Sequence, residues 1–110
     1  MSLDAVSTRA ADIRDRYHAL ERRLHGTPWS TGEDALAFLT DAALVGRLTM
    51  AAAGRWPTSA STTSRSIDDG ALAAKLAECV WWLAVLAQRQ GIDLGVAVDT
   101  FLTDKERSLP

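Results

Sequence analysis

Several features that would mark particular functions are missing from this sequence of 110 residues. Positive charge is not in excess, because the net charge is −2 and the sequence pI is about 5.6. This balance argues against a nucleic-acid-binding protein. No uninterrupted apolar run reaches the roughly 20 residues that a membrane span needs. The first residues carry charge but no apolar core, so no secretory signal is predicted. We therefore expect a cytoplasmic protein with no membrane or nucleic-acid partner.

The usual signatures of catalysis are also scarce. There is no glycine-rich phosphate loop, and no serine has a recognisable nucleophile setting. The single cysteine, Cys79, lies in an apolar stripe, where we expect it to pack rather than to react. His18 and His25 lie seven positions apart without a cysteine or carboxylate cluster, so no zinc site is predicted there. The charges of the first segment alternate in sign, from Arg9 to Arg23, which is typical of a solvated face.

Apolar residues recur at spacings of three and four in four segments, which predicts four helices. We expect these helices at about Leu3–Leu24, Thr31–Ala53, Ser66–Arg89 and Leu94–Ser108. Gly26 with Pro28, the polar stretch 54–66 and Gly91 separate them. Hydrophobic residues make up 47% of the chain, a normal value for a globular protein, and no strand pattern is present. The sequence therefore predicts one all-α domain over residues 1–110, built as a four-helix bundle.

Capping residues precede three of these helices. Ser30 and Glu33 form a capping box, Ser66 is followed by acids in a similar arrangement, and Asp93 can cap the last helix. We expect the acids near helix starts to cap or to meet solvent, namely Glu33, Asp34, Asp68 and Asp69. The stretch 54–66, rich in serine and threonine, is expected to be a surface loop.

The third helix is apolar on two sides. One stripe contains Leu72, Leu76, Cys79, Leu83 and Leu86, and the other contains Ala71, Ala74, Trp81, Trp82 and Val85. A single layer of helices covers both sides poorly, so we expect a homodimer or homotetramer. Trp81 and Trp82 are expected in the core or a subunit interface, and stacking on a base is the alternative.

Two lone carboxylates on apolar faces are the sharpest feature of the chain. Glu78 lies within the second stripe of the third helix, and Asp41 lies on the apolar face of the second helix with Ala37, Phe38, Leu44, Val45 and Leu48. Such an acid is paired, protonated or holding a cation. An ion pair with Lys75 or Arg47 is one reading of both acids. The other reading is a Mg²⁺ site, which takes carboxylate pairs three residues apart from two helices.

The run from Lys75 to Leu102, KLAECVWWLAVLAQRQGIDLGVAVDTFL, resembles the MazG-like nucleotide pyrophosphohydrolases, as does Pro28-Trp29 ahead of the acid-bearing helix. The similarity extends from about Pro28 to Glu106 and is densest from Leu76 to Val98. It implies an all-α fold that works as a dimer or tetramer. It also implies Mg²⁺-dependent hydrolysis of a nucleoside triphosphate to the monophosphate and pyrophosphate.

The resemblance assigns Asp41 and Glu78 to two of the four metal-ligand positions of this family. Leu44 and Lys75 occupy the other two, so we expect the activity to be attenuated or lost. Lys75 is a candidate for contacting a phosphate or for neutralising the two acids, and an exposed side chain is the alternative. Trp29 is a candidate for stacking on a base, and a helix-entry staple is its alternative.

Two hypotheses of other classes stand beside the enzyme. The first is a non-catalytic helical protein that binds a nucleotide or a partner subunit. The second is a structural dimerisation module. No catalytic residue is assigned from the sequence beyond the two metal-ligand candidates.

Overall fold

The computed structural model describes residues 1–55 and 65–110, and the side chains only of residues 1–55 and 70–110. These residues form four α-helices and no strand: α1 (Leu3–His25), α2 (Thr31–Ala52), α3 (Arg65–Arg89) and α4 (Leu94–Ser108). The all-α expectation is confirmed, and the helix bounds agree with the sequence to within a residue or two. The surface loop expected at 54–66 and the capping start at Ser66–Asp69 lie almost wholly outside the described side chains.

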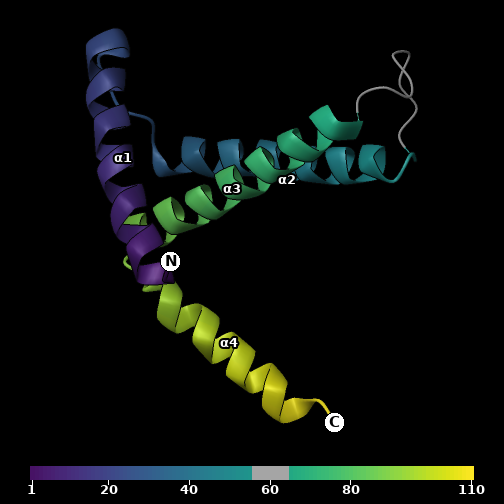
Figure 1. The fold of residues 1–110 in the computed structure, drawn as a ribbon. Coiled ribbons are helices and arrows are strands. Elements are labelled where there is room, and N and C mark those ends of the chain that lie inside the picture. The colour runs from purple at the N-terminus through teal and green to yellow at the C-terminus, as the bar shows by residue number, and fades with distance from the viewer. Residues whose placement is uncertain (56–64) are drawn as a thin grey trace.

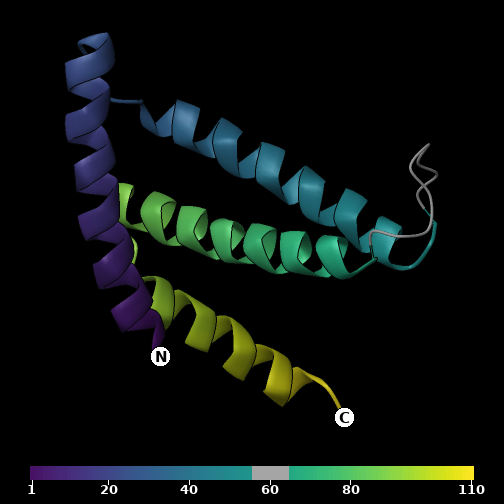
Figure 2. The same cartoon turned by 45° about the horizontal axis from the view of Figure 1, so that its top comes forward.

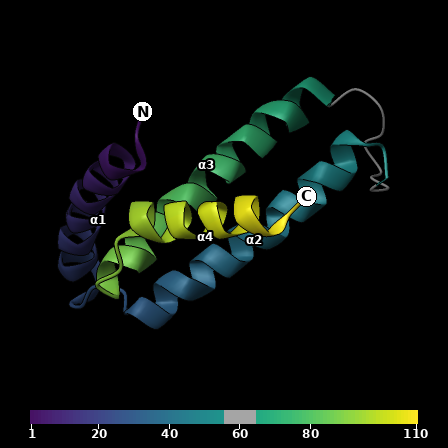
Figure 3. The ribbon, with the colours of Figure 1, turned by 90° about the horizontal axis from the view of Figure 1, so that it is seen from below.

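The helices form an open arrangement around one antiparallel pair. Helices α2 and α3 run side by side, and α1 lies across the end of that pair that contains the start of α2 and the end of α3 (Figures 1 and 2). Helix α4 leads away from this junction (Figure 1) and, among the described residues, packs against α1 and α3 alone. Seen from below, it passes in front of α3 and α2 (Figure 3). The radius of gyration is 17.1 Å, against about 13 Å for a compact domain of this length.

Local chemistry explains where the helices begin and end. The Ser30 hydroxyl accepts from Glu33 N at 3.1 Å, and the Glu33 carboxylate accepts from Ser30 N at 2.9 Å, so the expected capping box is confirmed. Asp93 accepts from Val96 N at 3.0 Å and begins α4 as expected. Helix α1 ends at Gly26, whose φ of 85° is a left-handed conformation that glycine adopts without strain.

The hydrophobic core is small and lies at the junction of α1 with α3. It consists of four buried residues, Ala10, Trp82, Ala84 and Val85, with Val6, Ala37, Phe38, Trp81 and Leu94 packed against them. Much of each apolar stripe remains exposed, including Leu76 and Leu83 of α3 and Phe101 of α4. The spacing of Leu94, Val98 and Phe101 predicts that they face inward, and this prediction is wrong at Phe101 in the single chain, where Phe101 is 59% exposed.

The inner face of α1 differs from the one that its apolar spacing predicts. Ile13, Tyr17, Leu20 and Leu24 are all exposed, whereas Ala10 and Arg14 are buried and Glu21 is partly buried. The predicted solvated face is therefore wrong at Arg14 and Glu21. The reason is that both side chains find partners on α2 and its preceding connector, as described below.

Helix α2 and residues Gly70–Arg89 of α3 are long and apolar enough to cross a membrane, judged by length and composition alone. The core helices of soluble bundles pass the same test. The expectation that no membrane is involved therefore remains a prediction.

Candidate functional site

The two acids that the sequence singles out meet at one cation between α2 and α3. Lys75 Nζ donates to Asp41 Oδ1 at 3.1 Å and to the two Glu78 oxygens at 3.3 and 3.4 Å. Asp41 lies on the less exposed side of α2, as predicted, and its side chain is 13% exposed. The ion-pair reading of Asp41 and Glu78 is thus confirmed with Lys75 as the partner.

The second oxygen of Asp41 is also occupied. Trp82 Nε1 donates to Asp41 Oδ2 at 3.0 Å, which links this ion pair to the hydrophobic core. Burial alone would raise the pKa of Asp41, but the hydrogen bonds from Lys75 and Trp82 outweigh burial and hold the pKa below its ordinary value. The same hydrogen bonds to Asp41 and Glu78 raise the pKa of Lys75 above its ordinary value. All these effects favour a charged pair at neutral pH.

These residues do not fit a divalent cation. Both Asp41 oxygens are engaged by nitrogen donors, and the Glu78 oxygens face the same ammonium. Leu44, about one turn after Asp41 on α2, offers only hydrocarbon. Among the side chains that the structure describes, no group of three or more histidine, cysteine, aspartate or glutamate residues could hold a metal ion. The Lys75 ammonium thus neutralises the Asp41 and Glu78 carboxylates, as a metal ion between them otherwise would.

An aromatic cavity of about 300 Å³ lies beside the ion pair. Its aromatic walls are Tyr17, Trp29, Trp81 and Trp82, and its polar walls are Arg14, Glu21, Asp41 and Glu78. The Trp29 and Trp82 rings are nearly parallel, with an interplanar angle of 6° and centroids 6.5 Å apart. Trp81 packs against Trp82 at 4.4 Å and against Tyr17 at 5.8 Å between centroids. The cavity therefore combines flat apolar faces with carboxylate acceptors.

A second charge network, which the sequence does not predict, meets this cavity at Arg14 and Glu21. Asp34 is fully buried and accepts from Arg14 Nη2 at 2.7 Å and from Arg89 Nη1 at 2.7 Å. Arg14 also donates to both oxygens of Glu21, at 2.8 and 3.4 Å. Asp34 was expected to cap or to meet solvent, which is wrong. Buried ionic groups persist only with such complete pairing.

This network fixes the position of Trp29. The Glu21 carboxylate accepts from Trp29 N at 2.8 Å, and Arg89 Nη1 donates to the Trp29 carbonyl at 3.0 Å. The Arg14 guanidinium lies 5.9 Å from the centroid of Trp29 and 5.7 Å from that of Trp82, within cation–π range. Trp29 thus packs on α3 through Trp82. It does not form the helix-entry staple, since Asp34 occupies the position that a staple would need to be apolar.

Burial affects three further polar groups near the cavity. Burial raises the pKa of Glu21, but the bonds from Arg14 and Trp29 N outweigh it, and the pKa lies below its ordinary value. Burial, followed by the charges of Arg14 and Arg89, lowers the pKa of His18. Within residues 1–55 and 70–110, His18 Nε2 and Trp81 Nε1 are buried without a hydrogen-bond partner. Both histidines were expected to have no zinc role, and this remains a prediction.

Of the sequence-predicted site residues, the structure brings Asp41, Glu78 and Lys75 into direct contact and places Trp29 on the same cavity. Arg14 and Glu21 were missed because charge alternation in α1 indicates solvent exposure, and Asp34 was missed because acids in the first turn of a helix usually cap or meet solvent. Cys79 packs as expected, and burial, followed by the charges of Asp41 and Glu78, raises the pKa of its thiol.

Comparison of the chain with protein-family models, curated proteins and solved structures gave no match.

Proposed function

We propose that this protein is a MazG-like helical domain that binds a nucleotide in the aromatic cavity without the metal-dependent hydrolysis of that family. One observation carries the proposal. The Lys75 ammonium lies within 3.1 Å of Asp41 and 3.3 Å of Glu78, the two remaining acids of the metal-ligand pattern. The resemblance supplies the family, and the Lys75 geometry supports the loss of hydrolysis.

The ligand-binding half of the proposal rests on how the cavity is built. Trp29 presents a flat face that is 38% exposed, and its backbone is held on both sides by Glu21 and Arg89. A preorganised aromatic face favours stacking on a planar ligand because little conformational entropy is lost on binding. A pocket with mostly apolar walls and a few convergent polar groups is the usual form of a small-molecule site.

We further propose that the working form is a homodimer or homotetramer. The chain exposes 7881 Å², whereas a compact monomer of 11.9 kDa exposes about 5,900 Å². The largest surface that residues 56–64 could contribute is about 1,300 Å². Subtracting it leaves about 6,600 Å², whereas a compact chain of the remaining mass exposes about 5,600 Å². The excess of roughly 1,000 Å² is close to the roughly 800 Å² that one partner buries in a standard interface.

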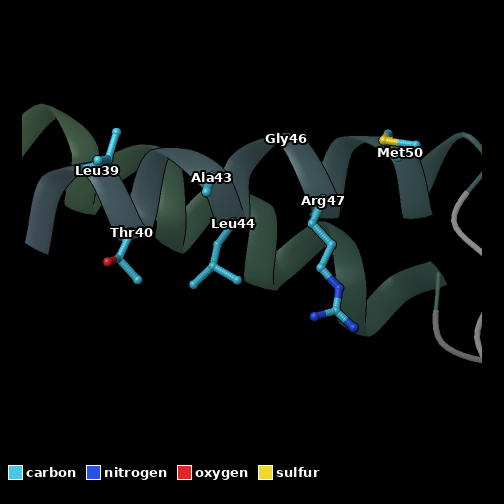
Figure 4. Close-up of a pocket in the computed structure, with 7 residues that line it drawn as sticks. All are labelled: Leu39, Thr40, Ala43, Leu44, Gly46, Arg47 and Met50. Atoms are coloured by element: carbon cyan, nitrogen blue, oxygen red, sulfur yellow. The ribbon is translucent and has the colours of Figure 1, made fainter. Parts of the chain in front are cut away.

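The outer side of α2 is the surface that we propose for a second copy. It carries a groove of about 740 Å³ lined by Leu39, Thr40, Ala43, Leu44, Gly46, Arg47 and Met50 (Figure 4). Leu36, Leu39, Ala43, Gly46 and Met50 alternate at spacings of three and four, which is the spacing of a helix–helix seam. Leu36 and Leu39 are 65% and 63% exposed. Light scattering should show that Leu39→Lys lowers the molar mass and that Asp12→Lys, on the exposed side of α1, does not. A wild-type monomer would contradict the assembly.

The catalytic half of the proposal is tested by pyrophosphate release from a panel of nucleoside triphosphates with Mg²⁺. We expect no release above the blank, together with a rise in melting temperature when nucleotide is added, because binding to the folded state alone stabilises it. Release that Asp41→Asn abolishes would instead show a working enzyme. If nucleotide neither stabilises the protein nor is hydrolysed, the structural module remains.

A reversion variant tests the role of Lys75 directly. The double substitution Leu44→Glu with Lys75→Glu restores acids at all four positions of the family pattern. We expect this variant to gain stabilisation by Mg²⁺ that the wild-type protein lacks, because oxygen ligands then converge without an ammonium among them. The control is Leu44→Gln with Lys75→Gln, which has similar side chains without the new charges. Equal stabilisation by Mg²⁺ in the wild-type protein and the reversion variant would contradict the assignment of these four positions as metal-ligand positions.

A further inference from the structure

We propose that the aromatic cavity selects the base and sugar of an amino-bearing nucleoside and disfavours its triphosphate. This inference rests on the proposed function and gives its ligand a chemical class. It is carried by three properties of the cavity: its charge, its size and its unpaired polar groups.

The charge around the cavity is acidic. Four carboxylates, Glu21, Asp34, Asp41 and Glu78, stand against three cations, Arg14, Lys75 and Arg89, which leaves a net charge of −1 in this cluster.

Each of the three cations already contacts two carboxylates or a carboxylate and a carbonyl. Lys75 binds Asp41 and Glu78, Arg14 binds Asp34 and Glu21, and Arg89 binds Asp34 and the Trp29 carbonyl. A phosphate chain would have to break these pairs to gain a cation. Breaking the buried Arg14–Asp34 pair leaves an uncompensated charge, which is strongly unfavourable. The Lys75–Glu78 pair is more exposed, at 27% and 46%, but the described side chains of this cluster still carry a net negative charge toward a triphosphate.

The size of the cavity also favours a nucleoside over its triphosphate. Its volume of about 300 Å³ is at the lower end of the range for small-molecule sites, which runs from about 300 to 1,000 Å³. The partly exposed ring of Trp29 suits a planar ligand, since every base has a π-face that stacks on an aromatic side chain. The cavity therefore matches a base with its sugar better than a full nucleotide.

The polar atoms of the cavity select for an amino group. Glu78 is 46% exposed at its side chain, and its carboxylate lies on the wall with acceptor capacity beyond its bonds to Lys75. Trp81 lines the same cavity, and its Nε1 is buried without a partner within the described side chains. A base with an exocyclic amino donor, such as cytosine or adenine, complements the Glu78 acceptor.

Calorimetry in EDTA tests this selection with cytidine and adenosine, each as nucleoside, 5′-monophosphate and 5′-triphosphate. We expect affinity to fall with each phosphate, with at least a tenfold loss from nucleoside to triphosphate. The loss should shrink as salt rises, because it is electrostatic. Glu78→Gln should reduce the difference in affinity between nucleoside and triphosphate, because it removes one repelling charge. Asp12→Asn, which removes an exposed charge of α1, should leave this difference unchanged.

Two outcomes separate the inference from the function beneath it. A triphosphate that binds as tightly as its nucleoside in EDTA, without turnover, overturns the inference and leaves the proposed nucleotide binding intact. If none of the six compounds binds, the proposed function itself fails. Trp29→Ala distinguishes binding in this cavity from binding elsewhere. This substitution should weaken binding of the nucleoside by roughly tenfold, which is within the range measured for loss of one stacking contact.

Discussion

Replacing Asp34 with alanine should destabilise the fold more than any surface change on α1. Asp34 is fully buried, and its removal leaves the Arg14 guanidinium, 4% exposed, with Glu21 as its remaining carboxylate. Removing one member of a buried ion pair costs about 3–5 kcal/mol in the free energy of unfolding. Arg14 keeps Glu21 and Arg89 is 25% exposed, so we expect the lower end, about 3 kcal/mol.

Urea denaturation at one fixed protein concentration measures this cost, since stability depends on concentration in an oligomer. A loss of about 3 kcal/mol corresponds to a fall of about 12 °C in melting temperature for a domain of this size. Asp34→Asn keeps one acceptor oxygen and should lie between wild type and Asp34→Ala. If Asp34→Ala does not fold, Asp34→Asn provides the measurement of the stability loss.

The matched control is the exposed pair Asp12–Arg16 on α1, the helix that carries Arg14. Arg16 donates to Asp12 at 2.6 Å, but the two side chains are 77% and 62% exposed. Exposed pairs contribute about 0.2–1 kcal/mol, so Asp12→Ala should cost less than about 1 kcal/mol. If Asp34→Ala costs no more than Asp12→Ala, the buried network does not hold the junction of α1, α2 and α3, and the reasoning about Trp29 fails with it.

Two further predictions concern the Trp82 hydrogen bond and the protonation of His18. Trp82→Phe removes the donor to Asp41 and should cost about 2 kcal/mol in the free energy of unfolding, whereas Trp81→Phe removes a donor without a partner in the described side chains and should cost less. Equal losses in urea denaturation would contradict the role of the Trp82 bond. For His18, whose pKa is lowered in the fold, the unfolded chain binds more protons just below pH 6.5. Stability should therefore fall as the pH drops from about 6.5. His18→Asn should flatten this slope between pH 7 and 5, and an unchanged slope in this variant would refute the assignment to His18.

The helices could be predicted because their signals are local. The capping box at Ser30 and Glu33, the cap at Asp93 and the glycine after α1 each act within a few residues, and all three are present in the structure. The face of α2 that carries Asp41 also follows from helical spacing alone. The pairing of Asp41 with Lys75 was one of the alternatives that this spacing left open, and only the packing of α2 on α3 decides it.

The Arg14–Asp34 network could not be predicted because its members are 20 and 55 positions apart and each resembles a solvated charge. Arg14 lies in a run of alternating charges, and Asp34 lies in the first turn of α2, where acids usually face solvent near the helix dipole. The angle at which α1 crosses the α2–α3 pair brings them together. In this arrangement the apolar stripe of α1 faces outward. The inner face of α1 is therefore predicted wrongly, although α1 has the clearest periodicity.

Trp82 takes part in both the fold and the candidate cavity. Its ring is part of the buried core, its Nε1 donates to Asp41 beside Lys75, and it lines the cavity with Trp29. A carboxylate that binds a metal must keep its oxygens available, whereas both Asp41 oxygens here accept hydrogen bonds from side chains of α3. Asp41 therefore serves the fold in this structure, because its two oxygens join α2 to α3.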